Sequence, residues 1–179
     1  SKYASGKEPP VFLQLCGEWA CEERSMASSV AAGMAKLFGG HILLLEHRYY
    51  GKSQPFPTLT TENLKYLTFR QVLEDTVQFR RQLGKDLKIT GPWIVFGGSY
   101  AGTMAAYLRS EYPDDFAAAY ASSAPVKVHF AFPGYNDKVA RSLGEKCTAD
   151  ILAVLGQVNS EWEAKSQYYK DSFKWNKVA

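Results

Sequence analysis

Ser99 is the residue whose surroundings indicate chemistry most clearly. It lies in residues 97–102, which read GGSYAG, between the apolar run 93–96 and the helix-like run 103–109. A serine between a strand and a helix is held at the tip of a sharp turn with its hydroxyl exposed, as a nucleophile for acyl transfer requires. The usual pattern is Gly-x-Ser-x-Gly. Here Ala101 takes the last position and is still small enough for the two backbones to pass closely. We predict that Ser99 is a nucleophile; the alternative is a glycine-rich turn with an incidental serine.

Acyl transfer also needs hydrogen-bond donors for the charge that develops on the substrate oxygen, each worth about 3–4 kcal/mol in a good site. We expect one donor to be the backbone N–H of Tyr100, the residue after the nucleophile. The other is expected from a loop after an earlier strand, and Gly17 and Glu18 follow the strand-like run 11–15. Two alternatives stay open: Gly17 is an ordinary turn glycine, or Glu18 turns its carboxylate into the site and binds a substrate amine.

A serine hydroxyl is a weak nucleophile until a base removes its proton, and that base is usually a histidine oriented by a carboxylate. In hydrolases with this turn, both partners follow the serine in the chain. The one histidine after Ser99 is His129, which comes too soon after the strand-like run 117–121 to be the base. We therefore expect the Asp and the His to come from a second chain or a C-terminal segment.

His47 stands at the carboxyl end of the apolar run 41–45, where ligands approach open α/β sheets. It precedes the serine, however, and the usual order places the base last. We interpret Glu46, His47 and Arg48 as a hydrogen-bonded network that braces the serine turn, since buried polar groups are normally satisfied in this way.

Other titratable residues are expected to have structural or surface roles. Asp75 falls in a helical pattern and is expected at the surface or bracing a neighbour. Asp114 and Asp115 are expected to form a solvated helix end. His41 at a strand start and His129 after a strand are both expected to be structural.

The composition narrows the classes of function. With 179 residues, 46% of them hydrophobic, the chain is long enough to bury a core. The net charge of +3 is small and the basic residues are scattered, which argues against nucleic-acid binding. No apolar run approaches the ~18 residues of a membrane span. The chain begins at Ser1 without a methionine, which suggests processing or truncation.

The three cysteines are Cys16, Cys21 and Cys147. An odd number in a secreted protein leaves one that needs a partner outside this stretch. Cys16 and Cys21 are close enough to pair if the loop between them bends. Their spacing resembles no metal site, and without clustered histidines they argue against zinc. We expect neither a metal nor a cofactor.

The elements that must position these residues alternate between strands and helices, which favours a mostly parallel sheet with helices on both faces. From Asp137 onward the apolar spacing is helical and no strand is evident, so we divide the chain into a core over residues 1–136 and a helical region over 137–179. Strands are expected at 11–15, 41–45, 93–96 and 117–121, and helices at 25–38, from a capping box at 68–71 to about Gly84, and after the serine turn until 112–115.

Three motifs in order resemble one family. Residues 46–53 (EHRYYGKS), 97–102 (GGSYAG) and 121–126 (ASSAPV) closely resemble the serine peptidases that include lysosomal Pro-X carboxypeptidase and dipeptidyl peptidase II. Ala101, with residues 135–137 and 141–143, is most similar to the thymus-specific serine peptidase branch. The resemblance covers residues from about 10 to about 155 and fades after that.

The resemblance implies an α/β-hydrolase core, present here in part, with the start of a helical cap insertion. It implies Ser99 as nucleophile, and a triad Asp and His beyond the cap that are absent from these residues. It also implies a peptide substrate, cleavage next to proline by an exopeptidase or carboxypeptidase, and a lysosomal, vacuolar or secreted location. Cys147 would pair with a cap cysteine outside this stretch.

Family members are much longer, so we expect this N-terminal part to be inactive by itself. Completion by a second chain, and a dimer, stay open. The alternatives are an esterase or lipase on the same fold and a non-catalytic binding or structural relative, because the serine turn alone does not separate these functions.

Overall fold

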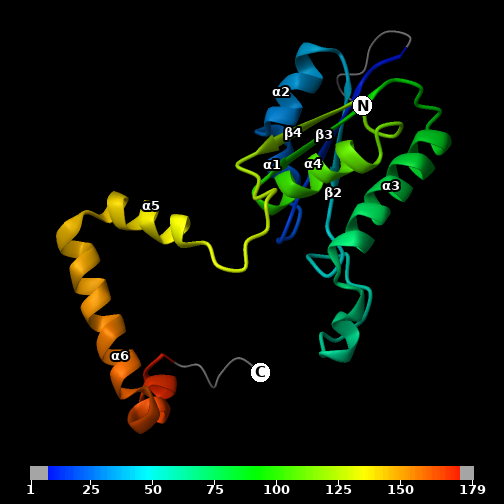
Figure 1. Ribbon diagram of the computed structural model, residues 1–179. Coiled ribbons are helices and arrows are strands. Elements are labelled where there is room, and N and C mark those ends of the chain that lie inside the picture. Colours follow the sequence, from blue (N-terminus) through cyan, green and yellow to red (C-terminus); the bar gives the residue numbers. More distant parts are fainter. Residues whose placement is uncertain (1–7, 174–179) are drawn as a thin grey trace. The chain divides into compact units, whose positions relative to one another are not determined.

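The computed structural model describes residues 8–173. The chain divides into two compact units, with the boundary in the sequence between Val128 and His129 (Figure 1). The opening residues, from which processing or truncation is expected, lie outside the described residues. The first unit holds a sheet with its covering helices, and the second holds two helices.

The first unit is built on a four-stranded parallel sheet in the order β2-β1-β3-β4, which confirms the predicted α/β architecture. All four predicted strands are present. β3 continues two residues further than expected, through Gly98, and β4 begins and ends one residue later than expected. Their bounds are β1 (Val11–Leu15), β2 (His41–Leu45), β3 (Trp93–Gly98) and β4 (Ala118–Ser122).

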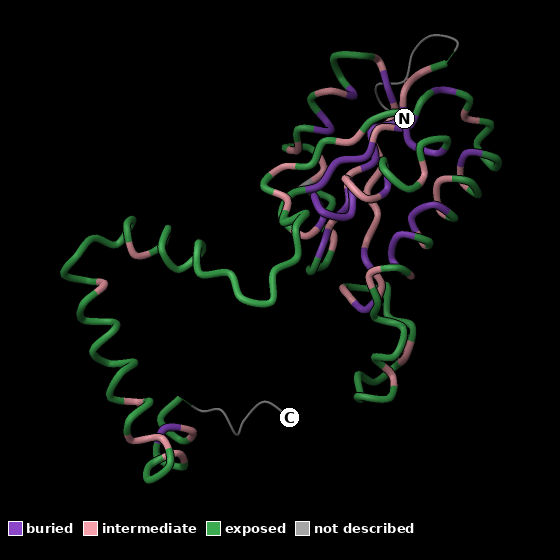
Figure 2. Tube along the Cα trace, in the orientation of Figure 1, coloured by how far each residue is buried: buried purple, intermediate pink, exposed green. Residues whose placement is uncertain are grey.

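Helices cover both faces of this sheet, and the alternation of side chains along β1 decides which face each residue serves. Val11, Leu13 and Leu15 pack into the larger core, which α3 (Phe69–Asp86) and α4 (Tyr100–Glu111) close from one side. Phe12 points the other way, where Ala31 and Ala35 of α2 (Val30–Leu37) cover it. Figure 2 shows the central strands β1 and β3 as mostly buried, whereas β2 is intermediate and β4 is largely exposed.

The single helix predicted over residues 25–38 is wrong in one respect, because the chain forms two helices there. They are α1 (Glu23–Ala27) and α2, separated by Ser28 and Ser29. The Ser29 hydroxyl accepts a hydrogen bond from the N–H of Ala32 at 3.1 Å and so caps α2. A serine that caps a new helix offers the backbone an alternative to continuing the previous one.

The predicted capping box before α3 is half formed. The Thr68 hydroxyl accepts from the N–H of Gln71 at 3.3 Å, as the motif requires. The Gln71 side chain instead accepts from the Thr68 hydroxyl and from Arg48. The helix also continues past Gly84 to Asp86, and a short 3-10 helix that the pattern did not predict precedes it at Glu62–Tyr66.

The second unit consists of α5 (Pro133–Leu143) and α6 (Glu145–Ser172), joined at Gly144 with φ +81°. Pro133 begins α5 four residues before the expected helical region, since proline is favoured in the first turn. Tyr169 is buried there and donates a hydrogen bond to Glu161 at 2.6 Å. This contact raises the pKa of Tyr169 to about 12.

Within residues 8–173, no helix is both long enough and apolar enough to cross a membrane.

Candidate active site

Ser99 lies at a sharp turn between the end of β3 and the start of α4. Its backbone has φ +54° and ψ −126°, a conformation that L-residues rarely adopt. The turn is anchored on both sides: the N–H of Ser99 donates to the carbonyl of Ser122 at 2.9 Å, and its carbonyl accepts from the N–H of Thr103 at 3.0 Å. The residue is exposed, and its hydroxyl has no hydrogen-bond partner among the described residues. The strand-turn-helix geometry is the one expected of a nucleophile elbow.

Close backbone approach explains the small residues around this elbow. A Cβ on Gly97 would lie 2.0 Å from the carbonyl oxygen of Ala101, and a Cβ on Gly102 would lie 2.9 Å from that of Ser122. A Cβ on Gly98 would meet nothing within 4 Å. Glycine is therefore required at 97 and 102 by packing, whereas position 98 is free of this constraint.

Because Gly17 has no side chain, the loop that contains it leaves room for the methyl group of Ala101. Gly17 is buried with φ +71°, and a Cβ built on it would lie 3.4 Å from the Ala101 Cβ. The loop after β1 thus lies directly against the start of α4. Neither Gly17 nor Glu18 donates its backbone N–H to another described residue, and Tyr100 is the first residue of α4, where the N–H has no partner within the helix. The expected oxyanion donors are close to the elbow, and their N–H groups have no hydrogen-bond partner among residues 8–173.

A disulfide holds this loop. Cys16 and Cys21, whose pairing the sequence left open, are bonded to each other, and Cys147 is a free, exposed cysteine. The Glu46 carboxylate accepts from the N–H groups of Cys21, Lys52 and Ser53 at 2.8–2.9 Å. Burial works against its charge, but these hydrogen bonds outweigh burial and lower the pKa of Glu46. Glu46 therefore ties the disulfide loop to the turn at residues 50–53.

His47 is the residue of the predicted network that reaches the elbow. It is buried, with Nδ1 at 2.6 Å from the carbonyl of Arg48 and Nε2 at 3.1 Å from the hydroxyl of Tyr100. A carbonyl can only accept, so Nδ1 carries the proton and the Tyr100 hydroxyl donates to Nε2. Burial lowers the pKa of His47, which favours this neutral form.

Arg48 fixes the same segment to α3. Its guanidinium donates to both carboxylate oxygens of Asp75 at 2.6 Å, to Gln71 at 3.1 Å and to the carbonyl of Tyr66 at 2.8 Å. The hydrogen bond to Asp75 is the main reason that the pKa of Arg48 is raised. Asp75 is thus a bracing residue. His47 and Arg48 are joined by the hydrogen bond from Nδ1–H to the Arg48 carbonyl, whereas the Glu46 carboxylate binds the N–H groups of the disulfide loop and of the turn at residues 50–53.

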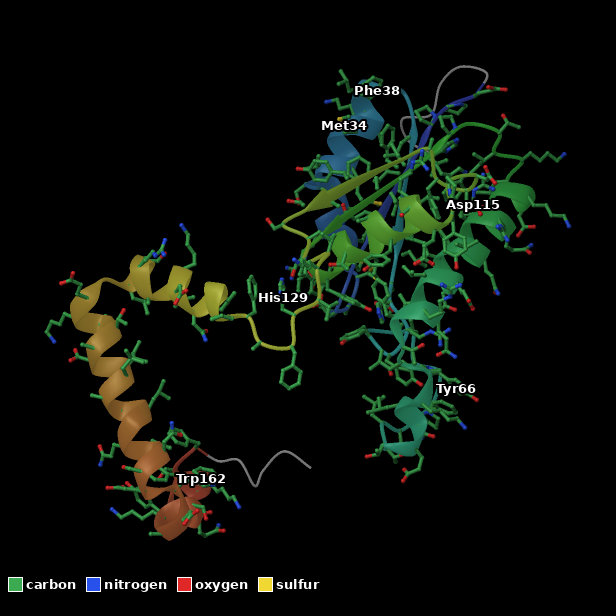
Figure 3. All side chains as sticks on the ribbon, viewed as in Figure 1. Met34, Phe38, Tyr66, Asp115, His129 and Trp162 are labelled. Atoms are coloured by element: carbon green, nitrogen blue, oxygen red, sulfur yellow. A yellow bond between two sulfur atoms is a disulfide. The ribbon has the colours of Figure 1, made fainter. Side chains whose placement is uncertain are left out.

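The prediction for Asp115 is wrong, because this residue is buried. Its carboxylate accepts from Arg81 at 2.6 and 3.0 Å, and its carbonyl accepts from Arg80 at 3.0 Å, so it joins the end of α4 to α3 (Figure 3). Asp114 is exposed, as expected. Asp114 and Asp115 are adjacent acidic residues at a helix end, and this sequence pattern does not show which of them is buried.

The two remaining histidines, His41 and His129, belong to different units. His41 begins β2, at the opposite end of the parallel sheet from Ser99, and burial lowers its pKa. His129 is exposed, belongs to the second unit and stacks on Phe132 with 5.5 Å between ring centroids (Figure 3).

Two cavities flank the elbow. The larger, about 620 Å³, contacts Ser99 and includes Cys16, Trp19, Cys21, Tyr120 and Ser122 in its lining. The smaller, about 200 Å³, lies on the Tyr100 side and includes Glu18, His47, Tyr50 and Phe69. Among residues 8–173, no three His, Cys, Asp or Glu residues are grouped so that they could hold a metal ion.

Comparison with known proteins agrees with this geometry. The family described as serine carboxypeptidase S28 matches residues 1–176. "Probable serine protease EDA2" of Arabidopsis thaliana is 38% identical over 154 residues, covering 81% of this chain and 31% of the relative. "Thymus-specific serine protease" of Mus musculus is 37% identical over 161 residues, covering 89% and 32%.

"Probable extracellular serine carboxypeptidase" of Arthroderma benhamiae is 33% identical over 147 residues, covering 77% of this chain and 20% of the relative. The chain therefore spans about a third, or less, of the length of these relatives. The predicted resemblance is confirmed. With its elbow at Ser99 and a match over nearly its whole length, the chain belongs to the serine carboxypeptidase S28 family.

Proposed function

We propose that this chain provides the nucleophile and the oxyanion donors of a serine peptidase. The observation that supports this most directly is the backbone of Ser99, which is kept at φ +54° at the end of a strand with an unpartnered hydroxyl. Strained backbone of this kind persists only where the surroundings hold it, and it is concentrated at functional sites.

In the proposed reaction, the Ser99 Oγ attacks the carbonyl carbon of a peptide bond and its proton passes to the base. The oxyanion accepts hydrogen bonds from the backbone N–H of Tyr100 and of Gly17 or Glu18. Collapse of the intermediate breaks the C–N bond, and the amine leaves with the proton. Water then hydrolyses the acyl-serine ester, which releases the acid and restores the hydroxyl.

The base is proposed to be a histidine oriented by an aspartate, both from outside these 179 residues. His47 is unsuited to this role, because Nδ1–H donates to Arg48 and Nε2 accepts from Tyr100, so neither nitrogen is free for Ser99. A C-terminal segment or a second chain would supply the two residues. In this proposal α5 and α6, with residues 137–179, begin the helical cap.

The substrate is proposed to be a peptide cleaved next to proline by an exopeptidase mechanism, in a lysosome or vacuole or outside the cell. The names of the relatives support a peptidase, and one of them carries the word extracellular. An esterase on the same elbow is the second candidate, since the elbow serves both ester and amide chemistry.

A fluorophosphonate probe tests the proposal on the complete protein that contains this chain. Labelling is expected at Ser99, located by peptide mass spectrometry, and is expected to disappear in Ser99→Ala. Ser123→Ala is the matched control, because Ser123 also has positive φ and lines the larger cavity. Absence of labelling at Ser99 would contradict a catalytic role. A higher kcat/KM for a short-chain ester than for a proline-containing peptide would favour the esterase.

A further inference from the structure

The smaller cavity beside the elbow combines one acidic side chain with several aromatic rings. We name it the Glu18 cavity; it has a volume of about 200 Å³ and includes in its lining Glu18, His47, Tyr50, Thr68, Phe69 and Tyr100. These residues come from the loop after β1, the segment after β2 and the starts of α3 and α4. The cavity is thus built by four separate parts of the first unit.

The rings form a continuous wall. Centroids of His47 and Tyr50 lie 5.2 Å apart, those of His47 and Tyr100 lie 5.6 Å apart, and those of Phe69 and Tyr100 lie 6.1 Å apart. The faces of such rings attract cations through their quadrupole, most strongly where water is partly excluded. An aromatic wall next to a carboxylate is the arrangement that binds ammonium and guanidinium groups.

Glu18 is an exposed residue at the lining of this cavity, and no cation lies beside its carboxylate among the described residues. Its carboxylate makes no hydrogen bond or ion pair with any residue in the described part of the chain, and neither Lys nor Arg lines the cavity. Arg48 lies beyond His47 but is held by both oxygens of Asp75. Burial lowers the pKa of His47, and burial first, then the charge of Glu18, raises the pKa of Tyr100.

The position of the cavity connects it to the proposed chemistry. Glu18 follows Gly17, the residue in contact with the start of α4, and Tyr100 follows Ser99. Tyr100 lines the cavity, so the cavity lies next to the elbow. We propose that the Glu18 cavity is a subsite for a positively charged group of the substrate. This inference rests on the proposed function for the position of the peptide.

Binding without turnover tests the subsite first. Fluorescent peptides in matched pairs, lysine against norleucine and a free against an acetylated N-terminus, are titrated by anisotropy into the complete protein carrying Ser99→Ala. The charged member of one pair is expected to bind about tenfold more tightly. Whichever pair shows the gain identifies the source of the cation as a side chain or an α-ammonium.

Glu18→Gln in the same background is expected to reduce that ratio to about two or less. The ratio is the readout because an effect on the neighbouring oxyanion donors would change both peptides equally. Glu23→Gln, at an exposed glutamate of α1, is the matched control and should keep the full ratio. If Glu18→Gln does not fold, 1 M salt should lower the ratio in the Ser99→Ala protein, since screening weakens the attraction.

Equal affinity within every pair, or a ratio that survives both Glu18→Gln and high salt, would overturn the subsite. Fluorophosphonate labelling of the unsubstituted protein is scored separately. Labelling at Ser99 without charge preference would refute the subsite and leave the peptidase proposal standing. Charge preference without labelling would refute the peptidase proposal and leave the cation-binding cavity.

Discussion

At Ser99, a costly backbone conformation is held by neighbours from two strands, a loop and a helix. A non-glycine residue in this region of φ and ψ costs about 1–3 kcal/mol. Ser122 provides the hydrogen bond from β4, Gly17 provides space from the loop after β1, and Gly97 allows α4 to cross the end of β3. The elbow is therefore a property of the assembled sheet and of local sequence together.

Gly97 and Gly98 are adjacent, but only Gly97 is required to be glycine by close packing. Gly97→Ala is expected to lower the free energy of unfolding by on the order of 3 kcal/mol, because its Cβ would overlap the Ala101 carbonyl oxygen at 2.0 Å. Gly98→Ala, where the Cβ meets open space, is expected to change it by less than about 0.5 kcal/mol. Urea unfolding followed by fluorescence measures both variants, and equal losses would contradict the role given to Gly97.

At the scale of elements, α3 holds the segment that follows β2. Arg48 binds Asp75 through two short hydrogen bonds, and the adjacent His47 binds Tyr100 at the start of α4. The path from α3 to α4 therefore runs through two adjacent residues of a loop. A change to the Arg48–Asp75 pair on α3 is therefore expected to affect the contact between His47 and Tyr100 beside the elbow.

Asp75→Asn is expected to cost about 1–2 kcal/mol of stability, because the bidentate pair is only partly screened by solvent. Glu74→Gln, one position earlier on α3, should cost much less since its pair with Arg70 is largely exposed. Thermal unfolding of the two variants compares them directly. Similar shifts in midpoint for both would mean that the Arg48 pair has no special structural role.

The strands were predictable because parallel strands covered by helices appear as short, largely apolar runs, such as Val11–Leu15 and His41–Leu45. The elbow was predictable because its glycines and serine are adjacent in sequence. The break before α2 was not, since Ser29 caps a helix only when the chain turns there. Nor was burial of Asp115, which depends on arginines of α3 that are distant in sequence.

At the scale of the whole molecule, an irregular segment connects the two units between the end of β4 and the start of α5. Its side chains include Val128 and Phe130, which are almost fully exposed. Backbone without helix or strand hydrogen bonds is where proteases cut most readily. We therefore expect the first proteolytic cut to fall in this connecting segment.

Chymotrypsin at low concentration is expected to cut the 179-residue chain first after Phe130, because this side chain is the most exposed large aromatic among the described residues. Mass spectrometry should show complementary fragments of residues 1–130 and 131–179. Phe130→Ala should slow or move the first cut. A first cut inside α3, α4 or α6 would contradict the division at this segment.

The hydrogen bond from Ser99 to Ser122 also has a consequence for biosynthesis. Of the four described strands, β4 comes last in the chain, and its final residue provides the acceptor that anchors the elbow. A nascent chain that ends before Ser122 contains Ser99 but lacks the carbonyl that accepts the hydrogen bond from its N–H. The hydrogen bond that anchors the elbow can therefore form only after a further 23 residues have been added beyond Ser99.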